Sequence, residues 1–98
     1  MSLLDELREK VAEKDKIIAE CQAFEGPGYR AQLAELAPHA DRDEDGNQNE
    51  AGLEIQKLNE LRRAAKAKRR ETYTERNLLL DLIAKAELVL KKVAAASE

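Results

Sequence analysis

The sequence predicts an all-α protein, namely an antiparallel helical hairpin or coiled coil with a short middle helix and one long C-terminal helix. Charged residues make up 38% of the 98 residues and aromatic residues only 3%, a composition typical of long helices and coiled coils. Neither glycine nor proline interrupts the chain after Gly52. At this length we expect a single domain over residues 1–98.

The first element is predicted to be a helix over residues 2–24. Ser2 is expected to cap it together with Asp5, and acidic residues in the first turn suit the positive end of the helix dipole. Apolar residues then recur at intervals of three and four, which places them on one helix face, and Lys14 occupies the one missing position. This stripe consists of Leu4, Leu7, Val11, Ile18 and Cys21.

The tripeptide Gly26-Pro27-Gly28 is predicted to end the first helix, because proline lacks a backbone donor and glycine permits left-handed turns. A short helix is expected to follow over residues 29–37, with Leu33 and Leu36 pointing inward. Pro38 is expected to end it.

A polar loop is predicted over residues 39–49 and a long helix over residues 50–95. Asn49 alone, or Asn47 with Glu50, is expected to cap the long helix. Its apolar residues keep the rhythm of three and four, except in the middle, where Lys68, Thr72 and Glu75 replace them. The predicted stripe consists of Leu58, Leu61, Ala65, Leu79, Leu82, Ala86, Val89 and Val93.

The C-terminal half of the long helix carries a wider apolar arc than one neighbouring helix covers. Exposed apolar stripes of this kind mark interfaces. We therefore expect the chain to form a homodimer or higher oligomer. The residues expected to pack in this interface are Leu79, Leu82, Ile83, Ala86, Val89, Leu90 and Val93.

The polar loop contains the pattern D-x-D-x-D-G at Asp41, Asp43, Asp45 and Gly46. Alternating carboxylates followed by glycine are typical of calcium loops, in which a later glutamate completes the coordination shell. Position twelve of such a loop is glycine here, so Glu50 at position ten and Glu54 at position fourteen are the candidate substitutes. The pattern predicts calcium as a ligand of Asp41, Asp43, Asp45 and Glu50; the alternative is a solvated acidic loop.

The same segment resembles the Excalibur calcium-binding module, whose D-x-D-x-D-G-x-x-C-E loop often follows a stretch like Pro-Gly-Tyr-Arg. Residues 27–30 read Pro-Gly-Tyr-Arg, and residues 41–50 supply the loop. Asn49 replaces the cysteine, and the ten residues 31–40 separate the two parts. The resemblance implies calcium binding, and such modules are typically extracellular.

A basic stretch occupies the middle of the long helix. Helical geometry gathers its cations and one tyrosine on a face that flanks the predicted apolar stripe. This face is either solvated, or binds a protein (including the acidic loop or first helix of a neighbouring chain), or lies along nucleic-acid phosphates. It consists of Arg62, Arg63, Lys66, Arg69, Arg70, Tyr73 and Arg76.

Several classes of site and of location are not expected. One cysteine, Cys21, and one histidine, His39, form neither an intrachain disulfide nor a zinc site of about four such ligands. No nucleophile or phosphate-loop motif is present, so we expect no enzyme. The residues Asp5 and Glu6 do not suit a signal peptide, and no apolar run approaches about 20 residues. We expect a cytoplasmic protein with no membrane association.

These features favour a non-enzymatic interaction, structural or adaptor protein that oligomerises and binds another protein. One variant has the acidic loop entering a cavity of a larger assembly, by analogy of shape with transcript-cleavage factors. The alternatives are a nucleic-acid-associated regulator that uses residues 62–76 and a calcium-responsive module that uses residues 41–50.

Overall fold

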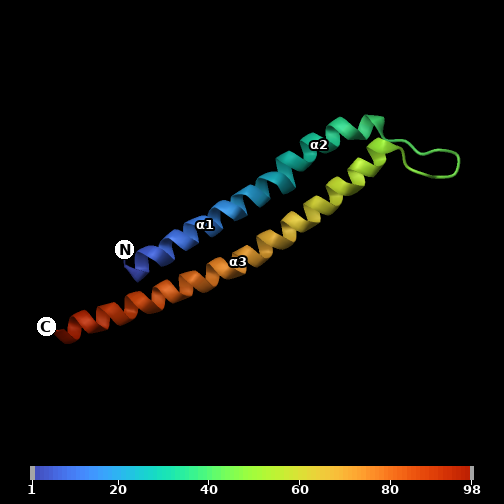
Figure 1. Ribbon diagram of the computed structural model, residues 1–98. Coiled ribbons are helices and arrows are strands. Elements are labelled where there is room, and N and C mark those ends of the chain that lie inside the picture. Colours follow the sequence, from blue (N-terminus) through green and yellow to red (C-terminus); the bar gives the residue numbers. More distant parts are fainter. Residues whose placement is uncertain (1, 98) are drawn as a thin grey trace. The chain divides into compact units, whose positions relative to one another are not determined.

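A computed structural model describes residues 2–97, and the described chain is helical apart from one loop (Figure 1). An isolated antiparallel bridge pairs Arg42 with Gln48, and no strand forms within residues 2–97. The all-α prediction is therefore confirmed. In chain order the elements are α1 (Leu3–Ala23), a π-helical turn (Phe24–Gly28), α2 (Tyr29–Leu36), a 3₁₀ turn (Ala37–His39) and α3 (Glu50–Ser97).

The predicted caps at the two helix starts are present. The backbone N–H of Asp5 donates to Ser2 Oγ at 3.2 Å. At the start of α3, Asn49 Oδ1 accepts the N–H of Gly52 at 3.0 Å and also that of Asp41 at 3.1 Å. Each acceptor satisfies a backbone donor that a helix start or turn leaves open.

The predicted helix end at Gly26-Pro27-Gly28 is wrong. The backbone stays in the right-handed helical region from Ala23 to Tyr29, and the Tyr29 N–H bonds back to the Phe24 carbonyl, five residues earlier. Inside a regular α-helix the ring of Pro27 would clash with the carbonyl four residues before it, and the wider π turn removes that clash. The chain therefore continues from α1 through this turn into α2.

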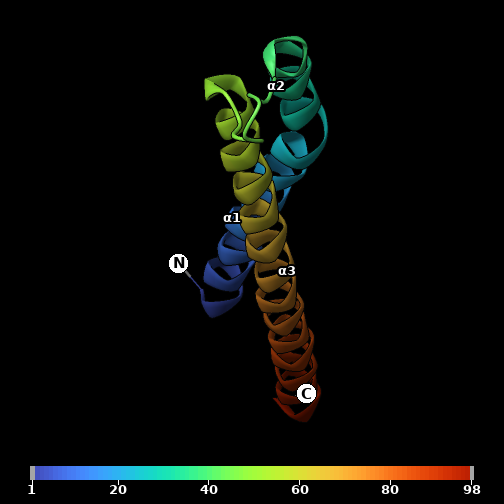
Figure 2. The ribbon, with the colours of Figure 1, turned by 90° about the vertical axis from the view of Figure 1, so that its right-hand side faces the viewer.

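The loop that joins α2 to α3 is seen in front of the helix ends in Figure 2. An aspartate organises this loop. Asp43 Oδ1 accepts the backbone N–H groups of Asp45 at 3.0 Å and Asn47 at 2.9 Å. Gly46 adopts a φ of 81°, the left-handed region in which glycine carries no steric cost. The D-x-D-G pattern thus builds a tight turn with Glu44 and Asp45 at its tip.

The described chain divides into two compact units. Unit 1 contains residues up to 18 and from 70 onward, and unit 2 contains residues 19–69. Ion pairs show that the helical segments of unit 1 run antiparallel, because Arg8 meets Glu87 whereas Lys14 meets Glu75. In unit 2, Glu25 meets Arg69 and Tyr29 meets Asn59, which again is an antiparallel order.

The buried stripe of α3 differs in part from the predicted one. Leu58 and Thr72 are buried as expected, but Leu61 and Leu82 are 58% and 51% exposed, and Lys68 is exposed. Ile83 is buried in their place. A neighbouring series recurs every seven residues on α3, with Arg62 exposed, Arg69 and Arg76 half-buried and Ile83 buried.

Candidate interaction surfaces

An apolar groove runs along one face of unit 1. Leu3 and Leu7 of α1 line one side, and Leu82 and Val89 of α3 line the other. Leu3, Leu82 and Val89 are 65%, 51% and 58% exposed, so these large side chains face solvent. The remaining lining residues are Ser2, Leu4, Lys85, Ala86 and Leu90.

A second hollow of unit 1 shares Leu82 with this groove and is more polar. Its lining includes Lys10, Glu13 and Leu78 together with the ion pair between Lys14 and Glu75. The polar positions predicted in the middle of the two stripes thus pair with each other. The face as a whole is apolar at one end and carries charges of both signs at the other.

The seven residues of the predicted oligomer interface divide into two groups. Ile83 is buried and Leu79 and Ala86 are half-buried, so these three contribute to the interior of unit 1. The other four are more than half exposed, and they are Leu82, Val89, Leu90 and Val93. The apolar surplus predicted from the sequence is present, and the oligomer itself stays a prediction.

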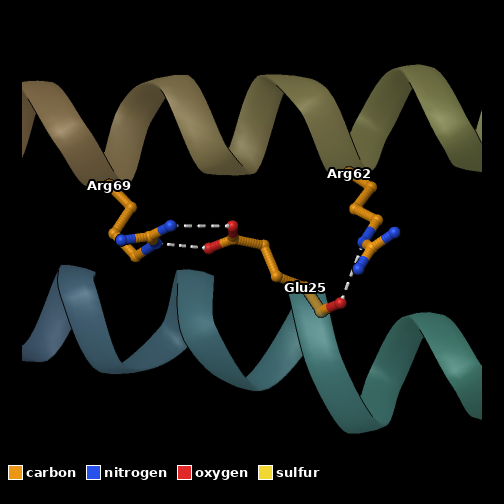
Figure 3. A network of polar contacts seen from close by, with 3 residues as sticks. All are labelled: Glu25, Arg62 and Arg69. Carbon is orange, nitrogen blue, oxygen red and sulfur yellow. Dashed lines mark hydrogen bonds and ion pairs between the residues drawn. The ribbon is translucent and has the colours of Figure 1, made fainter.

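Unit 2 contains a different kind of surface, built around the carboxylate of Glu25 at the π-helical turn (Figure 3). Arg69 donates to both carboxylate oxygens, from Nε at 2.7 Å and from Nη2 at 3.3 Å. Arg62 Nε donates to the backbone carbonyl of Glu25 at 3.1 Å. One glutamate therefore fixes two arginines that lie two helical turns apart on α3.

The aromatic ring of Tyr29 also contacts Arg62. Its guanidinium lies over the Tyr29 ring, 4.4 Å from the ring centroid, a cation–π arrangement. The Tyr29 hydroxyl in turn donates to Asn59 Oδ1. The Arg62 guanidinium is therefore held by a stacked ring and a carbonyl.

Positive charges outnumber negative charges around Glu25. The hydrogen bond from Arg69 holds the pKa of Glu25 below its ordinary value of 4.5, with further lowering by the charges of Arg69, Lys66 and Arg62. The same hydrogen bond raises the pKa of Arg69. A pocket beside Glu25 is lined by Arg62, Arg63, Lys66 and Arg69, so four cations surround one carboxylate.

Three arginines of the predicted basic face make contacts within the chain. Arg62 and Arg69 bond Glu25, and Arg76 pairs with Asp15 in unit 1. By contrast, Arg63, Lys66 and Arg70 are exposed and make no ion pair within residues 2–97. Tyr73 is 51% exposed, with the Arg76 guanidinium 5.7 Å from its ring centroid.

Three partners of these cations were not predicted from the sequence, namely Glu25, Asp15 and Tyr29. The recurrence of arginine every seven residues was the available signal, because a position that recurs with the heptad faces the same neighbouring helix. The partners of that position lie on another element. They become identifiable only when the antiparallel register is known.

The four predicted calcium ligands lie in the loop and at the start of α3. The Asp41 carboxylate accepts the N–H of Arg42 at 2.8 Å, and Asp43 is used by the turn. Within residues 2–97, no group of three acidic, histidine or cysteine side chains is placed to share a metal ion. Calcium binding by Asp41, Asp43, Asp45 and Glu50 stays a prediction.

No family model, curated protein or solved structure matches this chain.

Among residues 2–97, every helix is too short or too polar to cross a membrane. Cys21 is a buried free thiol, in agreement with its expected place among the apolar residues.

Proposed function

We propose that this chain is a non-enzymatic helical interaction protein that self-associates through the apolar groove of unit 1. The observation that carries the proposal is the groove itself, lined by Leu3, Leu7, Leu82 and Val89. Monomeric soluble proteins rarely expose a contiguous apolar surface unless it is an interaction site. The second copy supplies the same leucine and valine side chains, as a self-complementary contact requires.

The thin interior of unit 1 supports this proposal. Among the described residues of unit 1, Ile18, Thr72 and Ile83 are buried, and at least 5% of the surface of each is exposed. Burying the exposed leucines of the groove against a second copy contributes about 25 cal/mol for each Å² removed from water. Mixed charges in the adjoining hollow, such as Lys10 and Glu13, are able to pair with each other across a two-fold axis.

The proposal includes the larger arrangement. We infer that residues 1–98 form a single domain, an antiparallel helical hairpin of the coiled-coil type, in a cytoplasmic protein. The support is that buried and half-buried residues of α3 follow one heptad rhythm across both units, from Leu58 through Ala65, Thr72 and Leu79 to Ala86. A continuous heptad pattern keeps one face toward a neighbouring helix.

The test is sedimentation equilibrium of the double variant Leu82→Asp, Val89→Asp over a wide range of concentration. Two carboxylates in an apolar interface are desolvated without a partner. We expect self-association to weaken by about 100-fold or more.

The matched control is Leu88→Asp. Leu88 is 54% exposed on the same helix but does not line the groove, so this variant is expected to associate like the wild type. A monomeric wild type at all concentrations would contradict the proposal, and so would an equal loss of association in the control.

A further inference from the structure

The acidic loop of unit 2 carries charges that the chain itself does not neutralise. Residues 41–50 contain five carboxylates and one arginine, a net charge of −4. None of these carboxylates makes an ion pair within the described chain. Glu44 and Asp45 occupy the tip of the turn, and neither carboxylate accepts a hydrogen bond from residues 2–97.

The pocket beside Glu25 carries the opposite surplus. Four cations against one carboxylate leave a net charge of +3, and Arg63 and Lys66 are exposed at this pocket. The cations of this pocket already bind a carboxylate, because Arg69 donates hydrogen bonds to both oxygens of Glu25. Bidentate guanidinium contacts of this kind are among the strongest charge-assisted hydrogen bonds.

We propose that the pocket lined by Arg62, Arg63, Lys66 and Arg69 is a docking site for the acidic loop of a second copy of this chain. Glu44 and Asp45 at the tip of that loop contact Arg63 and Lys66, which make no ion pair within residues 2–97. When two copies are related by a two-fold axis, each loop reaches the pocket of the other and the contact forms twice.

Several observations favour the acidic loop over nucleic acid as the occupant. The carboxylate is the group that the pocket is seen to hold. Two of the four cations, Arg62 and Arg69, are already bonded to Glu25, which leaves a short site rather than a long basic track. The chain has a net charge of −3, so it repels an extended polyanion beyond this pocket.

The experiment uses two charge-reversed chains, each alone and then mixed. The loop variant is Glu44→Lys with Asp45→Lys, and the pocket variant is Arg63→Glu with Lys66→Glu. These four side chains form no ion pair or hydrogen bond within residues 2–97, and circular dichroism checks that each variant keeps its helix content.

Association is measured by sedimentation velocity at about 50 mM and about 500 mM salt, because screening separates charge contacts from apolar ones. At low salt we expect each variant alone to associate about tenfold more weakly than the wild type. Mixing the two variants restores association, since the basic loop of one chain meets the acidic pocket of the other.

Three outcomes would overturn the inference: variants that associate as well as the wild type, a mixture that associates no better than its components, or a pocket variant whose only loss is in binding a short duplex DNA added as a probe. The matched control replaces Lys91 and Lys92 by glutamate, because these exposed lysines lie in unit 1, outside the acidic loop and the pocket.

The contact between the acidic loop and the pocket involves residues of unit 2 alone. The groove variant Leu82→Asp, Val89→Asp is therefore expected to retain its salt-dependent part, which keeps the two proposals distinguishable.

Discussion

The two units of this chain share the long helix α3 but differ in which of its side chains the opposite segment leaves uncovered. In unit 1, α3 presents leucine and valine beyond what α1 covers, and the result is an apolar groove. In unit 2, α3 presents arginine and lysine beyond what Glu25 neutralises, and the result is a charged pocket. One helix thus provides two interaction chemistries in succession.

The difference follows from what occupies one heptad position of α3. In unit 2 this position holds Arg62 and Arg69, whereas in unit 1 it holds Arg76 and then Ile83. The arginines there are bonded to a carboxylate and a carbonyl of the opposite segment, since Arg69 and Arg62 both donate to Glu25. Ile83 requires only burial at this position, so many apolar side chains on the opposite segment can serve as its neighbour.

The largest expected effect tests which face of α3 is internal. Leu58 in unit 2 is 3% exposed, and Leu58→Ala is expected to reduce the free energy of unfolding by about 3 kcal/mol, as for other buried leucines. Leu61, three residues later, is 58% exposed, and Leu61→Ala is expected to cost less than about 0.5 kcal/mol. Urea unfolding followed by circular dichroism measures both. Similar losses in the two variants would mean that the internal face has been misassigned.

This pair also shows where sequence reasoning stopped. Among positions next to the buried stripe, Leu61 is more hydrophobic than the arginines Arg62 and Arg69, so periodicity alone favours the leucine. The arginines are nevertheless the ones engaged, because Glu25 is within reach of both. Their long apolar stems are also able to cover the seam while their charged ends pair. The sequence of one helix does not contain the register that brings Glu25 there.

Local rules succeeded where the determining group lies within a few residues. Ser2 and Asn49 cap their helices as predicted, and the aspartates with Gly46 form a turn. The helix-ending effect of Pro27 was also a local prediction, but it failed. The rule assumes a regular α-helix, whereas this chain accommodates the ring with a π turn.

The second effect concerns the charge pair that distinguishes unit 2. Because the pKa of Glu25 is lowered on folding, its stabilising contribution is complete above the unfolded value of 4.5 and is lost as the pH falls through the lowered folded value. Glu25→Gln is therefore expected to lower Tm at pH 7. The difference from the wild type should close as the pH falls through the lowered folded pKa of Glu25.

Thermal unfolding at a series of pH values measures this difference. Glu20→Gln is the matched control, because Glu20 is an exposed glutamate of α1 in unit 2 without an ion pair in the described chain. A constant difference between Glu25→Gln and the wild type at all pH values would show that the amide disturbs packing rather than charge.

A third, smaller effect contrasts the loop of unit 2 with its helical part. Gly46 has a φ of 81°, and a Cβ added to it would meet only open space, so Gly46→Ala is expected to cost about 1 kcal/mol through backbone strain alone. Gly26 lies in the π turn, where an added Cβ would come no closer than 3.9 Å to Arg30. Gly26→Ala is expected to stabilise by up to about 1 kcal/mol. Opposite signs in urea unfolding confirm the contrast; a loss in both variants would contradict it.

The smallest effect returns to unit 1 and its outermost ion pair. Arg8 and Glu87 lie 2.8 Å apart with side chains 55% and 51% exposed, whereas Arg69 and Glu25 are 29% and 14% exposed. Water and salt screen the exposed pair, so a double-mutant cycle with Arg8→Ala and Glu87→Ala is expected to give a coupling below about 0.5 kcal/mol. The same cycle on Arg69 and Glu25 should give a larger coupling that survives added salt better. If the two couplings were equal, burial would not be what distinguishes the ion pairs of unit 2 from those of unit 1.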